Sequence, residues 1–221
     1  MADLETPDDP ESIYLARGDD VGAYRPSFTG DVYRIDSGHL VMVLQHPCAL
    51  RRGVDLHPRI LVATVTPVPN GRLPSKWKGS YKIMPLPKLI ERNDHSASFV
   101  DLELLDSATI PNIERVAVLS QVGVNLLMQR WTFHNTRLQV PTYRYSESTI
   151  GPFDEADLIE EWVEERVDRG ADPRGAEREC AEWLDVKTNE RTRRELLGDA
   201  QHASSVRREA RAHRKAVKLD E

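Results

Sequence analysis

Residues 40–53 read LVMVLQHPCALRRG, an apolar run that stops at a His-Pro-Cys corner and is followed by two arginines. A short run of Val, Met and Leu bounded by turn residues is typical of a β-strand. Pro47 has no backbone N–H to donate to a strand ladder, so the chain is expected to turn there. The stretch therefore predicts a strand that ends at Pro47.

Four other runs share this pattern. Each is short, rich in β-branched or aromatic residues and bounded by turn signals such as DSG and PNG. They are GDVYRID (30–36), RILVATV (59–65), SYKIMPL (80–86) and SFVDLELL (98–105). Together with residues 40–45 they predict a small, strongly bent β-barrel.

The pattern changes to helical spacing after the last of these runs. Apolar residues recur at that spacing in VGVNLLMQRW, which predicts a helix at about 121–136 that closes the barrel. Pro141 and the polar stretch SESTIGP (146–152) then mark a boundary. The fold class is therefore α+β, a barrel with a closing helix and a C-terminal helical extension.

The extension begins with acidic residues at the start of PFDEADLIEEWVEERVDRG (152–170), where a helix dipole favours them. A second helix is expected from about 174 to 186. The last segment carries six Arg or Lys between Val206 and Lys218 against Glu209 alone. This basic tail is either a solvated helix or a contact for a polyanion or an acidic partner.

Three regions follow from these patterns. Residues 1–28 are acidic and are expected to form a mobile leader, unless Ile13, Tyr14 and Leu15 pin it to the barrel. Residues 29–145 form the β-barrel domain with its closing helix. Residues 146–221 form the helical extension with the basic C-terminal tail.

Composition narrows the class of protein. A hydrophobic fraction of 39% in 221 residues supports one moderate core with a small helical appendage. The net charge of −6 argues against a general affinity for nucleic acid, so any basic surface must be local. The N-terminus has no signal-peptide pattern and no apolar run reaches about 20 residues, which predicts a cytoplasmic protein without membrane contact.

The His46-Pro47-Cys48 corner raises the possibility of a thiolate nucleophile, because a neighbouring base lowers the pKa of a thiol. No orienting carboxylate or glycine-framed turn accompanies Cys48, so we expect a buried structural cysteine. The histidines are scattered, and no paired metal-ligand motif or phosphate loop occurs. No metal and no cofactor are therefore expected.

A basic rim is the candidate nucleic-acid surface. Arg51, Arg52 and Arg59 flank the apolar strands and are either solvated or placed to bind phosphate oxygens through paired hydrogen bonds. Tyr33 and Trp77 are the aromatic residues on which a base of single-stranded RNA can stack.

The order TGDVYRID, HLVMVLQ and RILVATVTPV, within residues 29–70, resembles the opening of the MazF/PemK-type toxin barrel. The resemblance implies an SH3-like antiparallel barrel and a homodimer. In active members of the family it implies metal-independent cleavage of single-stranded RNA. That cleavage uses an Arg before the second strand and a Ser or Thr at the end of the third.

Two candidate catalytic residues follow from the resemblance. Thr66 matches the threonine of the pattern. The arginine position falls on Gly38 or His39, so the arginine is absent, and His39 is the candidate replacement because imidazole exchanges protons near neutral pH. Gln45 stands where the second strand of the family usually has a serine.

Two functions of different classes follow. The first is a non-catalytic nucleic-acid- or protein-binding barrel module. A toxin–antitoxin or phage-defence assembly is one setting in which such a module would act. Its partner surface would include Trp162 and Trp183, unless these tryptophans only pack one helix against another. The alternative is a diverged metal-independent endoribonuclease of MazF/PemK type that acts on single-stranded RNA through His39 and Thr66.

Overall fold

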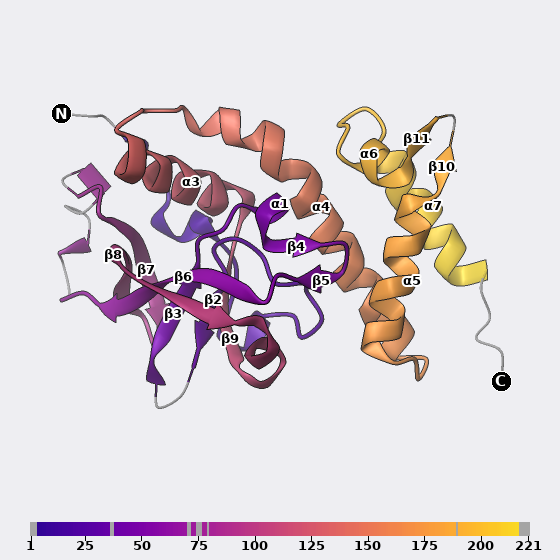
Figure 1. Cartoon of the computed structure of the whole chain (residues 1–221), viewed down its shortest axis with the longest axis horizontal. Helices are drawn as coiled ribbons and strands as arrows, with labels where there is room; N and C mark the ends of the chain where they lie inside the picture. The colour runs from indigo at the N-terminus through magenta and orange to yellow at the C-terminus, as the bar shows by residue number, and fades with distance from the viewer. Residues whose placement is uncertain are drawn as a thin grey trace. The chain divides into compact units, whose positions relative to one another are not determined.

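A computed structural model describes residues 4–35, 38–69, 72–73, 77–78, 80–188 and 190–216. The chain divides into two compact units. The barrel unit comprises Met1–Val21, Ser27–Arg52 and Leu56–Thr149, and the helical unit comprises Gly22–Pro26, Gly53–Asp55 and Ile150–Glu221. Figure 1 shows strands and helices together in one chain, which confirms the α+β class.

The barrel unit is built on one seven-stranded antiparallel sheet that closes almost completely into a barrel. Its strands follow the order β1-β9-β2-β3-β6-β8-β7. Their bounds are β1 Tyr14–Arg17, β2 Val32–Arg34, β3 Leu40–Val43, β6 Arg59–Pro67, β7 Ile83–Ile90, β8 Asn93–Asp106 and β9 Glu114–Leu119. All five strand predictions therefore fall in this sheet.

Within residues 40–53, strand β3 forms the centre of the sheet. All four residues of β3 are buried, because β2 and β6 pair with it on its two sides. Pro47 is the first residue of a short helix, α1 (Pro47–Leu50), rather than a simple reversal. The chain then forms a small hairpin, β4 (Arg51–Arg52) with β5 (Asp55–Leu56).

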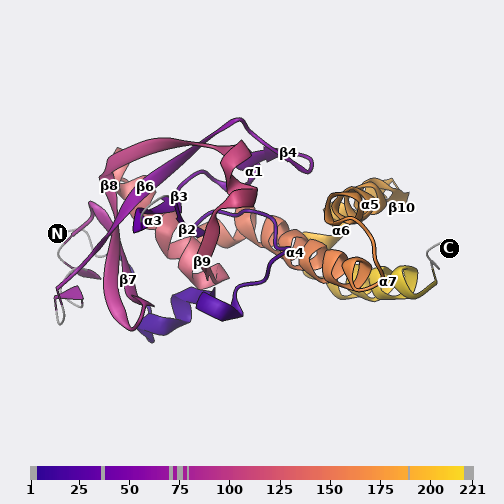
Figure 2. The ribbon, with the colours of Figure 1, turned by 90° about the horizontal axis from the view of Figure 1, so that it is seen from below.

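Strand β8 is long and bent. Its first half pairs with β7, from Ile83↔Ser98 to Ile90↔Asn93, and with the end of β6, whereas its second half pairs with the start of β6. The register on β6 jumps between Ala63↔Leu102 and Val65↔Ala97, which marks the bend. Figure 2 shows β6 and β8 running beside each other.

The acidic leader differs from the expectation of a mobile segment. It contains a 3₁₀-helix, η1 (Pro10–Ile13), then β1, and then η2 (Gly18–Asp20). Strand β1 pairs with β9, and Ile13 is completely buried. Acidic composition suggested disorder, but a few apolar side chains between the charges are enough to add an edge strand.

Helix α3 (Gln121–Thr136) confirms the predicted closing helix. Ser120 caps it by accepting a hydrogen bond from the Gly123 backbone N–H at 3.2 Å. A 3₁₀-helix, η4 (Ser107–Asn112), connects β8 to β9. One core of the barrel unit is made by β2, β3, α1, β6, β8 and η4. It contains Tyr33, Val41, Val43, Leu50, Ile60, Val62, Leu105 and Ile110.

The two units divide between Thr149 and Ile150, within the predicted boundary at residues 146–152, and the chain is helical there. Helix α4 (Thr142–Val167) starts at Thr142 and continues through Pro152. The Glu5 carboxylate fixes this start, because it accepts hydrogen bonds from the Thr142 N–H at 2.8 Å and from its hydroxyl at 2.5 Å. A carboxylate is favourable at a helix N-terminus, and a contact so distant in sequence is invisible to local patterns.

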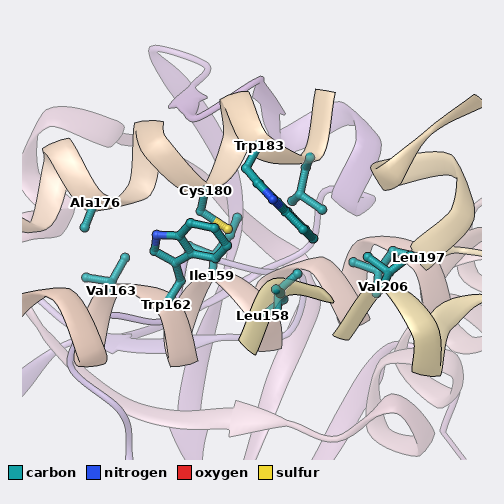
Figure 3. Packing of buried hydrophobic residues seen from close by; sticks show 11 residues of the cluster. Leu158, Ile159, Trp162, Val163, Ala176, Cys180, Trp183, Leu197 and Val206 are labelled. Atoms are coloured by element: carbon teal, nitrogen blue, oxygen red, sulfur yellow. The ribbon is translucent and has the colours of Figure 1, made fainter. Parts of the chain in front are cut away.

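The helical unit packs α5 (Pro173–Asp185), α6 (Arg193–Leu197) and α7 (Ala203–Ala216) with the later turns of α4. A small hairpin of β10 (Lys187–Thr188) and β11 (Arg191–Thr192) precedes α6. Figure 3 shows the apolar side chains that meet at its centre. They are Leu158, Ile159, Trp162, Val163, Ala176, Cys180, Trp183, Leu184, Leu197, Val206 and Ala210.

The described part of the basic tail is packed on one side and exposed on the other, where Arg208, Arg211 and Lys215 lie. It forms α7, which buries Val206 and Ala210. Arg214 pairs with Glu165 at 2.8 Å and Arg207 with Asp154 at 2.8 Å. The acidic partner of these two arginines therefore lies on α4 of the same unit.

Candidate functional site

His39 and Thr66 lie at the same end of the β3–β6 ladder. Leu40 pairs with Val65, so His39 and Thr66 are the next residues outward on the two strands. His39 Nε2 lies 2.7 Å from Glu103 Oε1, and both side chains are 41% exposed. The Thr64 hydroxyl lies 3.5 Å from the same carboxylate oxygen. Strand register thus gathers His39, Thr64, Thr66 and Glu103, which we call the His39 cluster.

The His39 cluster has an acid–base group but not the other parts of a ribonuclease site. A carboxylate can orient an imidazole for proton transfer, and Glu103 lies within hydrogen-bond distance of His39. The rim arginine Arg59, however, begins β6, whereas Thr66 lies near its end. Seven residues of strand place them about 23 Å apart. Arg59 therefore does not contact a phosphate that Thr66 contacts.

The other rim arginines also belong to the far end. Arg51 donates to the Ser27 carbonyl at 2.6 Å, a contact that holds the chain before β2. Arg52 is exposed on β4. The structure thus separates the predicted phosphate-binding residues from the predicted catalytic residues.

Tyr33 cannot stack on a base in this structure because it is only 1% exposed. Its hydroxyl lies 2.8 Å from the Ser27 hydroxyl and accepts from Arg115 Nε at 3.1 Å. Burial and the neighbouring Asp31 raise the pKa of Tyr33 to about 12. Asp31, completely buried, accepts from the Phe28 N–H at 2.9 Å, so the Gly-Asp-Val motif has a structural role here.

Trp77 is also buried, at 6% exposure, and its ring lies against the Arg130 guanidinium, 5.2 Å from it. Arg130 donates to the carbonyls of Ile83 at 3.0 Å, Trp77 at 3.1 Å and Ser80. Burial lowers the pKa of Arg130 to about 10. Both aromatic candidates for base stacking are therefore corrected to packing residues.

Cys48 is exposed, which contradicts the expected buried cysteine. Proline at the first helical position turns the chain so that Pro47, not Cys48, is buried. His46 Nδ1 accepts the Cys48 backbone N–H at 3.3 Å, so a neutral ring carries its proton on Nε2. That proton points to the Ser148 hydroxyl, 3.3 Å away. His46 therefore acts as a helix cap and cannot take a proton from Ser148.

Trp162 and Trp183 do not present a partner surface. They are 0% and 7% exposed, and their ring centroids are 5.4 Å apart. Trp162 Nε1 donates to Glu179, which also accepts two hydrogen bonds from the buried Arg166. Burial raises the pKa of Glu179, but these hydrogen bonds outweigh it and hold the pKa below its usual value. The simpler reading, in which the tryptophans pack helices together, is the one the structure shows.

An open groove of about 1220 Å³ lies at the barrel seam, between β1 and the end of β7. Side chains bridge this seam. Arg17 donates to the Lys88 carbonyl at 2.7 Å, and Lys88 Nζ lies 2.5 Å from Glu11. The hydrogen bonds from Lys88 and Arg17 hold the pKa of Glu11 below its usual value. Positive and negative groups neutralise each other here, so the groove lacks the single sign of charge that a polyanion needs.

Sequence reasoning missed an exposed apolar row on β8. Val100, Leu102 and Leu104 are 67%, 41% and 62% exposed. Acidic residues lie between them, at Asp101 and Glu103. The alternation in VDLEL is visible in the sequence, but it predicts one buried face and does not reveal that this face stays uncovered. Large exposed apolar side chains grouped on one strand are typical of an interaction surface.

Comparison with models of known protein families and with curated proteins gives no match. Among the residues that the structure describes, no group of three or more His, Cys, Asp or Glu is arranged to hold a metal ion. In the same described ranges, none of the helices combines the length and apolar character needed to cross a bilayer.

Proposed function

We propose that this chain is a non-catalytic protein-interaction module whose barrel unit carries the binding surface. The observation that carries the proposal is the row of Val100, Leu102 and Leu104, three large apolar side chains exposed on successive outward positions of one strand. Keeping such a row in water is unfavourable, so a partner that covers it gains hydrophobic free energy.

The distribution of charged and aromatic groups supports protein over nucleic acid as the partner. Phosphate binding needs grouped Arg or Lys, and base stacking needs exposed aromatic rings. Arg51 is engaged with the Ser27 carbonyl, and Tyr33 and Trp77 are buried. The net charge of −6 further disfavours binding to RNA.

A second candidate is the metal-independent endoribonuclease of MazF/PemK type. The 2.7 Å contact between His39 and Glu103 favours it, because a histidine oriented by a carboxylate is a general acid–base group. The resemblance to that toxin family stays a prediction, as does a role in a toxin–antitoxin or phage-defence assembly.

One experiment separates the two functions. The purified chain is incubated in EDTA with a mixed pool of fluorescent single-stranded RNA, alongside His39→Ala and Thr66→Ala. An interaction module leaves the pool intact and shows no RNA affinity that falls steeply with salt. Turnover that disappears in His39→Ala would replace the module with the ribonuclease.

A positive readout complements this assay. Affinity capture from the source cells is compared between the wild type, Leu102→Ser/Leu104→Ser and Leu138→Ser. Leu138 is the control, because it is 64% exposed and is not part of β8. We expect one stoichiometric protein with the wild type and the control, and its loss with the double variant. Recovery of RNA alone would contradict the proposal.

A further inference from the structure

The second half of β8 lies at the edge of the sheet. Pairing of β7 with β8 ends near Ser98, where the Phe99 N–H donates to the Lys82 carbonyl at 2.8 Å. Across residues 102–106, β6 pairs with β8 on one side. Within the described ranges no strand pairs with the other side, which we call the β8 edge (residues 100–106).

Strand register shows which backbone groups face outward. The Leu61 N–H donates to the Gln45 side chain at 3.0 Å, and its carbonyl accepts from the Leu44 N–H at 3.0 Å. Leu61 therefore directs both backbone groups toward β3, and its neighbours Ile60 and Val62 direct theirs toward β8.

Leu104 is paired opposite Leu61, and Leu102 opposite Ala63. Because hydrogen-bonded and non-hydrogen-bonded pairs alternate along an antiparallel ladder, the N–H and C=O groups of Leu102 and Leu104 point away from β6. The outward backbone groups thus belong to the same residues as the exposed apolar side chains. A strand laid along this edge would meet both.

The charge of the β8 edge is of one sign. Asp101, Glu103 and Asp106 are its charged residues, and it contains no Lys, Arg or His. Asp101 is exposed, and Glu103 is half-buried beside His39. Opposite charges placed across neighbouring strands stabilise pairing, whereas like charges destabilise it.

We propose that the β8 edge binds an extended segment of a partner protein in which apolar residues alternate with Lys or Arg. The segment adds to the sheet as an outer strand, with hydrogen bonds to Leu102 and Leu104, apolar contacts along Val100, Leu102 and Leu104, and basic groups near Asp101 and Glu103. This inference rests on the proposed interaction function and specifies its surface and the chemistry of its partner.

A second copy of the chain fits this edge less well. Two-fold pairing of one β8 edge with another brings the acidic residues of both copies together. Pairing centred on residue 103, for example, places Glu103 directly opposite its own copy, which is destabilising. Charge complementarity therefore favours a basic segment over self-association.

The test uses the full chain and two labelled heptapeptides, measured by fluorescence anisotropy at low salt. The first alternates lysine and valine, starting and ending with lysine, and the second has glutamate in place of lysine. We expect the lysine peptide to bind at least about tenfold more tightly, from charge complementarity across the strands. A lysine–valine peptide with proline as its central residue should lose binding, because proline disrupts strand pairing.

Variants locate the site. Leu104→Ser should weaken binding of the lysine peptide about tenfold, from the apolar area lost, whereas Leu138→Ser should leave it unchanged. The two leucines are 62% and 64% exposed, so neither substitution is expected to unfold the chain. Asp101→Lys should narrow the preference for the lysine peptide over the glutamate peptide.

Equal affinity for the two peptides, or indifference to Leu104→Ser, would overturn the docking mode. A dimer in light scattering that Leu104→Ser dissociates would also overturn it and assign the edge to a second copy. These failures differ from failure of the interaction function itself. RNA turnover that depends on His39 would contradict the interaction function. A partner protein that is still captured by Leu102→Ser/Leu104→Ser would support the interaction function but place the binding surface elsewhere.

Discussion

Arg130 shows how one buried charge can organise a loop. Its guanidinium is fully buried and donates to three backbone carbonyls, those of Trp77, Ser80 and Ile83. Backbone carbonyls buried without a donor are costly, so a charged donor with several N–H groups is well suited to hold an irregular segment. The strands follow from local sequence patterns, but the segment that contains Trp77, Ser80 and Ile83 depends on Arg130, more than forty residues away.

Arg130→Met should therefore lower the free energy of unfolding by about 3 kcal/mol or more, because it leaves buried carbonyls without their donor. Urea denaturation followed by circular dichroism measures this change. Arg144→Met is the control, since the Arg144 side chain is 58% exposed and its loss should cost at most about 0.5 kcal/mol. Similar losses in the two variants would show that the carbonyl contacts contribute little.

His46 makes the stability of the barrel unit depend on pH. Burial lowers the pKa of His46 below its ordinary value of about 6.5 in the folded chain. Between these two pKa values the unfolded chain binds more protons, so stability falls as pH drops through about 6.5 toward the folded pKa. Protonation of Nδ1 also removes the acceptor for the Cys48 N–H.

His46→Asn should weaken this pH dependence, because an asparagine oxygen can cap the helix but does not titrate. The free energy of unfolding is measured for both proteins from about pH 5 to pH 7.5, and their difference is compared. His134, whose pKa is also lowered by burial, contributes equally to both proteins and cancels. Parallel pH curves for the two proteins would rule out His46 as the source.

Two helices offer a matched comparison at their third residue. Gly123 in α3 and Gly175 in α5 each donate a backbone N–H to the capping side chain, Ser120 or Asp172. A Cβ on Gly123 would lie 2.1 Å from the Ile13 carbonyl oxygen, whereas a Cβ on Gly175 would meet nothing closer than 3.4 Å. The glycine in α3 is therefore required by the close approach of η1.

Gly123→Ala should destabilise the barrel unit by about 2 kcal/mol, since the backbone must move. Gly175→Ala should instead be neutral or stabilise by up to about 1 kcal/mol, as alanine favours helix. Thermal unfolding of both variants checks the contrast. A gain in stability from Gly123→Ala would mean that η1 can shift without cost.

An element can be predicted from the sequence when the interactions that define it are between residues close together in the chain. Strand β3 and helices α3 and α5 were predicted because apolar periodicity and caps are local signals. Strand β1 and the start of α4 were not, because Ile13 and Glu5 act through partners far along the chain. Of the candidate site, the resemblance named His39 and Thr66 as a pair, and strand register brings them to the same end of the β3–β6 ladder. The burial of Tyr33 and Trp77 depends on tertiary packing, which local patterns do not reveal.

In the whole molecule, the helical unit has a core separate from that of the barrel unit. Ala210→Asp should therefore release α7 and cost the helical unit about 3 kcal/mol, because it buries a charge at a completely buried position. Ala212→Asp, on the exposed side of the same helix, is the control. Hydrogen exchange should rise in α5 and α7 and not in β6 or β8; a parallel rise in the strands would show one cooperative core.

The assignment of residues 22–26 to the helical unit has a consequence for synthesis on the ribosome. Arg25 pairs with Glu160 at 3.0 Å, across 135 positions of sequence. Strand β1 cannot pair until β9 has been synthesised. The first residues of each unit therefore emerge from the ribosome long before their partners, so the units cannot fold one after the other from the N-terminus. For the same reason, a fragment starting at residue 150 would lack Tyr24 and Arg25, and genetic dissection of this protein should keep the early residues with the late helices.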